Sequence, residues 1–362
     1  MADSSGVTDA QLLDLINGTR AKQLPLNDMG FDVALTHNDY EAVNRWMAKD
    51  KIVIDSGTQI ERRVQLDQAG TAQWVHLYEA DDYNQMDLMS TLTAPWRQCH
   101  VYWMIERREL YRNRTGSKLV DLLKERRVGA MMAMADLLEP DFMTGPTVAS
   151  DDRTCYGIQM MIGKAEDSTG TGFYGGLSSD FTTVCGIAPC TSDSGTSSIA
   201  GGKAMWRNYC DYYTSVNAAL LKKLRTAFKR IKFRAPVTTR DLAQGPKSNY
   251  RIYGDIGTIV DLEDLAEKRN QNLGSDLGRF AGMATFANVP MIALDTLDSD
   301  ADDPLYMVNH NDYQVFVLEG DYLREGDAHP MDRNHNVFVT DVDLSVNALI
   351  RNRRHQACIC KV

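Results

Sequence analysis

The segment SKLVDLLKERRVGAMMAMADLL, residues 117–138, carries the most regular pattern in the chain. Its leucines, alanines and methionines recur mostly at steps of three and four, and charged residues fill much of the remainder, as in an amphipathic helix. Thr115, Gly116 and Ser117 fit an N-terminal cap. Pro140 predicts a stop or kink at residues 139–140, because proline clashes with the preceding helical turn. At about 1.5 Å per residue the helix spans roughly 33 Å, which is long for a globular protein.

The stretch before this helix has the pattern of β-strands. Apolar runs at 52–66, 74–78 and 101–105 are separated by polar and turn-forming residues. Apolar and polar side chains alternate within the first run, and the run at 74–78 is placed to pair back on it. The sequence therefore predicts a long hairpin or ribbon over residues 51–112, whose two-sided polarity suits exposure in a monomer and burial in an assembly.

The chain after the helix mixes loops, helices and strands. Residues 145–203 are rich in Gly, Ser and Thr and predict loops with short strands. Ser215 is the expected cap of a second helix with an apolar stripe over 220–231, and 258–272 predicts a third helix that stops near Gly274. The strands expected further on are 291–294, 306–308, 315–318 and 337–339.

Composition limits the class of protein. The chain has 362 residues, 43% hydrophobic and 24% charged, which is ordinary for a folded protein. Its formal net charge of -10 argues against a protein that mainly grips nucleic acid through phosphates. No apolar run is long enough to cross a bilayer and the start, MADSSGVTDA, has no signal-peptide pattern. We therefore expect folding in a reducing cytosol, no membrane partner, and free thiols at the seven scattered cysteines.

Three fragments resemble active-site motifs but lack the required context. Residues 170–175 match G-x-G-x-x-G, yet a loop follows where a dinucleotide site needs a helix. Residues 201–203 lack the glycine spacing and the hydroxyl of a phosphate-binding loop. Residues 193–195 resemble a serine nucleophile without a placed base. We predict no catalytic residues, no cofactor, and a protein that is not an enzyme.

Two other clusters are candidates for metal binding, and a third cluster is a candidate for nucleic-acid binding. The acidic loop 295–303 departs from the EF-hand pattern and favours a solvated turn, with a bound cation as the alternative. His355 with Cys358 and Cys360 lacks a fourth ligand, so free thiols are favoured over a metal site or a cross-link to another subunit. The basic stretch 222–234 favours a solvated helix face paired with acidic neighbours, with nucleic-acid contact as the alternative. We predict no metal.

An ordered set of short strings resembles the major capsid proteins of tailed bacteriophages of the Hong Kong 97 type. The likeness runs from about residue 50 to the C-terminus. The strings are SGT at 56–58, LYEAD at 77–81, PWR at 95–97, IERRE at 105–109, VDLLK at 120–124, NLG at 272–274, DPLY at 303–306 with Asn309, HNVFV at 335–339 and RNRR at 351–354.

The resemblance implies an α+β fold, the Hong Kong 97-like capsid fold. Residues 1–50 would be the N-terminal arm and 51–112 the E-loop, which reaches over a neighbouring subunit. Residues 113–144 would hold the spine helix of the peripheral (P) domain. Residues 145–328 would form the axial (A) domain, and 329–362 would return to the P-domain as strands that pack on the spine helix.

The resemblance also implies a function. Many copies would assemble as hexamers and pentamers into an icosahedral shell that encloses double-stranded DNA without sequence-specific binding. Assembly would take place in the host cytoplasm, and the product would be the capsid of the virion. A separate scaffolding protein, a portal and decoration proteins are the implied partners. Some family members carry a scaffolding segment at the N-terminus; the arm here is too short to include it, so the scaffold is expected to be a separate protein, with a segment that is already absent as the alternative. The alternatives are an encapsulin-like compartment shell and an unrelated cytosolic enzyme.

Charged residues of the ribbon are our predicted intersubunit contacts. The alternative is that several of them face solvent, where an ion pair contributes only about 0–1 kcal/mol. The predicted contact residues are Arg62, Arg63, Glu79, Arg107, Arg108 and Glu109.

Overall fold

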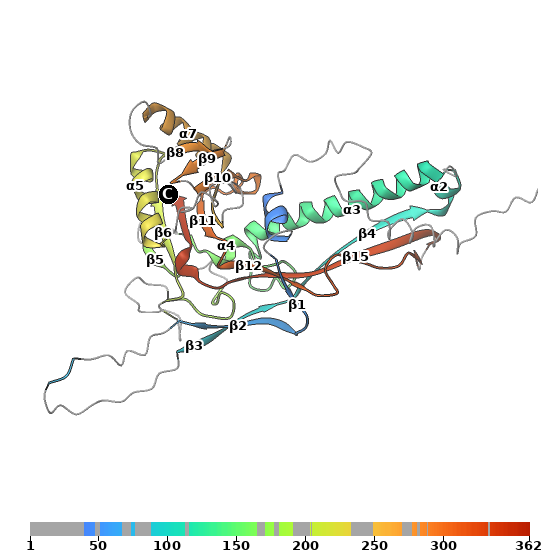
Figure 1. Ribbon diagram of the computed structural model, residues 1–362, viewed down its shortest axis with the longest axis horizontal. Coiled ribbons are helices and arrows are strands. Elements are labelled where there is room, and N and C mark those ends of the chain that lie inside the picture. Colours follow the sequence, from blue (N-terminus) through green and yellow to red (C-terminus); the bar gives the residue numbers. More distant parts are fainter. Residues whose placement is uncertain are drawn as a thin grey trace, which may run out of the picture.

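The structure is a computed structural model in which two β-sheets and one long helix form the body of the protein (Figure 1). It describes residues 40–47, 51–66, 74–76, 88–112, 116–164, 171–176, 181–190, 203, 205–232, 249–269, 277–280, 283–287, 289–331 and 334–362. Within these residues no helix is long and apolar enough to span a membrane.

The first sheet has six strands and is built around one long strand, β15 (Asn334–Ile350). β15 pairs with all but one of the other strands, and its ladder with β4 runs from Val337 opposite Glu106 to Val346 opposite Arg97. The other strands are β1 (Ile52–Ile54), β4 (Arg97–Glu106), β12 (Tyr313–Leu318), β13 (Arg324–Glu325) and β14 (His329–Met331). The strands expected at 315–318 and 337–339 are confirmed.

The long helix α3 (Gly116–Thr144) packs along β4 and covers one face of this sheet (Figure 1). Its buried side chains recur with helical spacing, as the sequence predicts. Among them are Leu123, Ala130, Met134 and Leu138. Arg127 of α3 bonds Glu325 of β13 at 2.5 Å, which ties the helix to the sheet by charge as well as by apolar contact.

Of the stop or kink predicted at residues 139–140, the stop is wrong, because α3 continues through Pro140 to Thr144. Packing explains the continuation: Phe142 and Met143 are fully buried, and Thr144 Oγ1 donates to the carbonyl of Pro140 at 2.9 Å. The buried apolar side chains of this last turn offset the hydrogen bond that proline removes.

The second sheet has eight strands in the order β5-β6-β16-β11-β7-β10-β9-β8. They are β5 (Gly172–Tyr174), β6 (Asn208–Tyr213), β16 (Ala357–Lys361), β11 (Leu305–Asn309), β7 (Tyr250–Gly254), β10 (Val289–Ala293), β9 (Met283–Phe286) and β8 (Leu277–Phe280). The expected strands at 291–294 and 306–308 correspond to β10 and β11.

Two helices, α5 (Ala218–Arg230) and α7 (Ile256–Arg269), share one apolar core with this second sheet. The predicted stripe of α5 is confirmed, since Leu220 and Leu224 are fully buried. The predicted cap at Ser215 is wrong: the side chain of Asn217 accepts the N–H groups of residues 219 and 220. Helix α7 begins two residues earlier than expected, and the expected stop at Gly274 lies outside the described residues.

The ribbon differs in its pairing from the sequence prediction. β2 (Gln59–Gln65) pairs with β3 (Met89–Pro95) in an antiparallel two-stranded sheet, whereas Trp74–His76, within the run expected to pair with it, forms no strand. The run at 101–105 belongs to β4. It pairs with β15, a strand more than two hundred residues later in the sequence. Short helical segments complete the described chain: η2 (Val43–Met47), α2 (Arg107–Arg112), α4 (Ile158–Met161), η5 (Asp295–Leu297) and η6 (Arg353–His355).

The two sheets interleave along the chain. β12 and β13 lie within the predicted range 145–328 but belong to the six-stranded sheet with β15. β16 lies within 329–362 but pairs with β6 and β11 in the eight-stranded sheet, not on the long helix as expected. From β11 onward, the chain therefore crosses between the sheets at 310–312 and again at 351–356. The five domain ranges themselves stay predictions.

Candidate assembly surfaces

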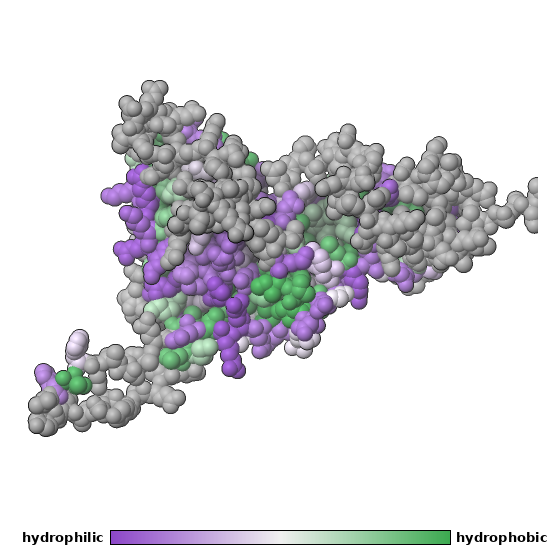
Figure 2. Space-filling view, viewed as in Figure 1, coloured by the Kyte–Doolittle hydropathy of each residue, from purple (hydrophilic) through white to green (hydrophobic). Residues whose placement is uncertain are grey.

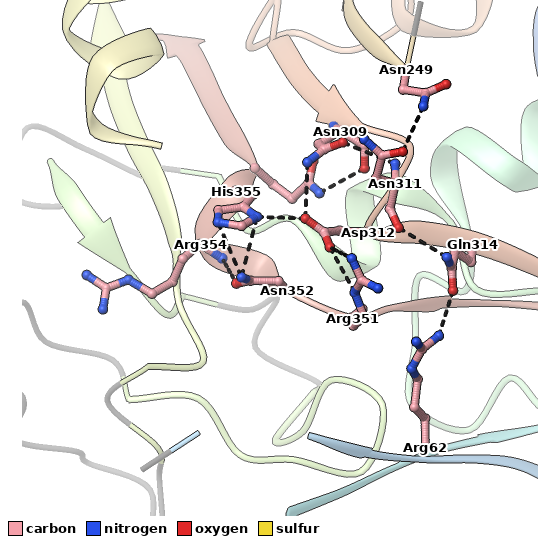
Figure 3. Close-up of polar contacts among 11 residues, drawn as sticks. Arg62, Asn249, Asn309, Asn311, Asp312, Gln314, Arg351, Asn352, Arg354 and His355 are labelled. Atoms are coloured by element: carbon pink, nitrogen blue, oxygen red, sulfur yellow. Dashed lines mark hydrogen bonds and ion pairs between the residues drawn. The ribbon is translucent and has the colours of Figure 1, made fainter. Parts of the chain in front are cut away.

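The two crossings between the sheets meet at the buried carboxylate of Asp312 (Figure 3). Oδ1 of Asp312 accepts from Nε and Nη2 of Arg351 at 3.0 and 2.8 Å, and Oδ2 lies 2.7 Å from Nδ1 of His355. The side chain of Asn309 also donates to Oδ2, at 3.1 Å. A desolvated carboxylate with several charged and neutral donors holds its partners firmly, so this group fixes the two crossings side by side.

The ribbon is anchored to the same junction. Nη1 of Arg62 in β2 donates to Oε1 of Gln314 at 2.8 Å, and the amide of Gln314 donates to the carbonyl of Asn311 (Figure 3). Ile60 and Leu92 are buried at the base of the ribbon. The orientation of the ribbon is therefore set by the body of its own subunit through polar and apolar contacts.

A buried cation, Arg353, lies beside this junction. The guanidinium of Arg353 is fully buried and donates to the carbonyls of Met161 and Trp206 and to Oδ1 of Asn208, at 2.8, 3.0 and 2.9 Å. Burial lowers the pKa of Arg353 to about 10, against the opposing effect of Cys210 and Cys185. Sequence analysis assigned no role to Arg353, Asp312 or Arg351, although two of them stand in the RNRR string that carries the family resemblance.

Three of the predicted intersubunit contacts, Arg62, Arg108 and Glu109, have partners within the same chain. Besides Arg62, Glu109 pairs with Arg126 at 3.3 Å, and Arg108 lies 3.9 Å from Glu106 with both side chains half exposed or more. Arg63 is exposed and Arg107 half-buried, while Glu79 lies outside the described residues. Their role between subunits stays a prediction.

Exposed apolar side chains mark surfaces that the single chain leaves uncovered. Along β4, Trp103 and Ile105 are buried under the long helix, whereas Tyr102 and Met104 are 53% and 41% exposed on the opposite face. Trp74, beyond the paired part of the ribbon, is 103% exposed. Figure 2 shows apolar side chains gathered where Figure 1 places β1, the strand that carries the half-exposed Val53. Surfaces of this kind mark sites of association.

The acidic loop at 295–303 is occupied by the chain's own cations and N–H groups. Lys164 bonds Asp300 and lies 3.5 Å from Asp302, and Lys361 bonds Asp303. Oδ1 of Asp298 accepts the backbone N–H of Ile256 at 3.0 Å. Across the described residues, no group of three or more His, Cys, Asp and Glu side chains is arranged to hold a metal ion.

The cysteines are free thiols, as expected from the sequence. Cys358 and Cys360 are fully buried on β16, with their sulfur atoms 3.4 Å apart, and are not accessible for a cross-link to another subunit. Burial raises the pKa of Cys358, which keeps the thiol protonated. His355 turns away from them toward Asp312. The G-x-G-x-x-G residues include the short edge strand β5, with no helix at the last glycine.

Comparison with known proteins identifies the fold. No family sequence model matches the chain, and no curated protein matches it in sequence. The chain is similar to a subunit of the cyanophage A-1(L) capsid, with TM-score 0.55, 11% identity and coverage of 96% of this chain and 99% of the other. It is also similar to the capsid of the native GTA particle, with TM-score 0.53, 12% identity and coverage of 94% and 96%.

A third solved structure, the mature capsid of bacteriophage PhiM1, matches with TM-score 0.51, 12% identity and coverage of 94% of this chain and 92% of the other. All three matches extend over nearly the whole of both chains, so the arrangement of ribbon, long helix and two sheets is shared as a unit. The chain therefore has the α+β, Hong Kong 97-like capsid fold that its sequence resembles.

Proposed function

We propose that the chain is the major capsid protein of a tailed bacteriophage. Many copies assemble as hexamers and pentamers that close into an icosahedral shell around double-stranded DNA. The observation that carries the proposal is the full-length likeness to phage capsid subunits at TM-scores of 0.51 to 0.55. The assembled shell is the capsid of the virion, built in the host cytoplasm.

The surfaces of the single chain support a shell-forming role. Within the described residues, the long helix packs on the face of β4 that buries Trp103 and Ile105, and the opposite face exposes Tyr102 and Met104. Beyond the paired part of the ribbon, Trp74 is fully exposed. Burying apolar area contributes about 25 cal/mol per Å², so copies of the chain gain stability by covering these surfaces on one another. Symmetric repetition supplies the cover for every copy.

The proposal assigns the chain no catalytic activity and no cofactor. Its partners are further copies of itself, a separate scaffolding protein, a portal and decoration proteins. DNA is enclosed without sequence-specific binding, in keeping with the net charge of -10.

The test is expression of the full chain alone and together with scaffolding protein and portal, followed by light scattering and negative-stain microscopy. Closed shells, or rings of five and six subunits, support the proposal. Shells that fill with double-stranded DNA in the presence of the packaging machinery separate a phage capsid from an encapsulin-like compartment, which encloses protein cargo. A particle-free preparation under all these conditions reopens the enzyme alternative.

A further inference from the structure

The outer face of α5 carries positive charge without any acidic residue. Its inner face is apolar and buried in the core of the eight-stranded sheet, and the helix sequence AALLKKLRTAFKR contains no Asp or Glu. Lys223 is half-buried and bonds Asp211 at 2.8 Å. Lys222, Lys229 and Arg230 are exposed, and Lys232 follows just after the helix. Figure 2 shows hydrophilic side chains along the side of the molecule where Figure 1 places α5.

The outer face of α7 is acidic and apolar. Ile259 and Leu262 point into the shared core, whereas Asp261 and Asp264 are exposed. On the same exposed side, Val260 is 52% exposed. Residues 260 and 264 are four apart and residues 261 and 264 three apart, so they form one stripe on the helix.

The described groups beside this acidic stripe bond chiefly to other partners. Lys361 lies close enough to Asp261 for the carboxylate to contribute to its raised pKa, but the first cause of that rise is a hydrogen bond with Asp303. Asp255, at the start of α7, is turned to the backbone N–H of Thr258 at 3.0 Å. The stripe of Asp261, Val260 and Asp264 therefore remains on the surface.

We propose that, in the assembled shell, the basic face of α5 docks on the acidic and apolar face of α7 of a second copy of this chain. The inference rests on the proposed function, because it requires copies arranged side by side around a common axis. The two faces have opposite charge and lie at different places on the same sheet, so the contact is heterologous. A heterologous contact repeats from copy to copy and closes into a ring when the rotation allows it.

A second copy fits the two faces better than a nucleic acid does. The exposed Val260 needs an apolar partner, and the aliphatic stems of Lys222 and Lys229 supply one while their ammonium groups reach the carboxylates. A nucleic acid is a polyanion, and the net charge of -10 on the whole chain opposes its approach to the positive face of α5. A contact of this type steers association and weakens as salt is added.

The test is a charge swap in the full chain, with assembly followed by light scattering and microscopy. Lys222→Glu with Lys229→Glu should reduce the assembled fraction about tenfold, and Asp261→Lys with Asp264→Lys should do the same, because like charges then face each other. Combining all four substitutions should restore assembly. Arg153→Glu, at an exposed bend that belongs to neither helix, is the matched control and should assemble as the parent chain does.

Each result has one meaning. Thermal melting of the unassembled chain should be unchanged in every variant, because the altered side chains are exposed. If the parent chain forms shells and neither double variant impairs them, the contact is wrong and the proposed function stands. Shells that form normally from Lys222→Glu with Lys229→Glu but hold less DNA would overturn the contact in favour of nucleic-acid binding by α5. If the parent chain forms no shells with scaffold and portal, the function and the contact fail together.

Discussion

The indole N–H of Trp46 donates to Nδ1 of His310 across 2.7 Å, with both side chains buried. An indole nitrogen is only a donor, so Nδ1 of His310 carries no proton, and Nε2 holds the proton 2.8 Å from the hydroxyl of Tyr253. The ring of Trp46 also packs on Phe142 of the long helix and on Tyr313 of the six-stranded sheet, at centroid distances of 5.3 and 5.0 Å. Tyr253 belongs to β7 of the eight-stranded sheet. The side chain of Trp46 therefore links the long helix to the six-stranded sheet directly, and to the eight-stranded sheet through His310.

Replacement of Trp46 should therefore destabilise the whole subunit. Trp46→Ala is expected to lower the free energy of unfolding by about 3–5 kcal/mol, because it leaves a cavity and removes the donor to His310. Trp46→Phe should cost less, since it keeps much of the ring packing. Urea unfolding of the unassembled chain measures both, and equal effects of the two variants would contradict this assignment.

Replacement of Arg353 should be as damaging as a change in the apolar core. Arg353→Met removes the donors of three buried oxygen acceptors, so a loss of about 3 kcal/mol or more is expected. Arg353→Lys keeps a charge but not the planar fork, and should rescue only part of the loss. The free energies of unfolding of both variants provide the check. A fully stable Met variant would show that the three acceptors find other donors.

The pH dependence of stability should contain a small contribution from Asp343. Hydrogen bonds from His100 and then from Arg324 lower the pKa of Asp343 below its usual value. A lowered carboxyl pKa stabilises the folded state above the ordinary carboxyl pKa, and this stabilisation is lost as pH falls through the folded-state value. Asp343 and both of its partners are partly exposed, so the contribution of Asp343 to the free energy of unfolding should stay below about 1 kcal/mol. Asp343→Asn should flatten the acid side of the melting-temperature profile; an unchanged profile would contradict the assignment.

Trp74 should matter for assembly and not for folding. Its side chain is fully exposed, so Trp74→Ala should change the free energy of unfolding by no more than about 0.5 kcal/mol. Aromatic side chains are frequent anchors of interfaces, and the same variant should sharply reduce the yield of shells. Trp74→Phe is the matched control and should assemble better than the Ala variant. Normal assembly of Trp74→Ala would exclude an anchoring role.

Local patterns predicted the local elements well. The period of the apolar residues in 117–138 identified the long helix, and short apolar runs identified the strands of the second half of the chain. Local rules failed where distant parts of the chain decide the outcome. Pro140 remains helical because Phe142 and Met143 are buried by other elements, and the run at 101–105 pairs with β15 and not with its sequence neighbours.

The buried polar groups were beyond reach of the sequence for the same reason. Arg353 looks like an ordinary member of a basic string until the fold brings the carbonyls of Met161 and Trp206 to its guanidinium. The run of charges at 222–234 was identified, but the acidic face of α7 that complements it comes to light only when burial is known for each residue. Assembly surfaces are properties of the folded face, which a linear pattern shows only in part.

The most direct test of the account is the mass of the particles that the full chain forms with its scaffolding protein and portal. Closed shells are expected by light scattering, with rings of five and six subunits visible in negative-stain images. Monomers or dimers alone, under the same conditions and with a correctly folded chain, would contradict the account.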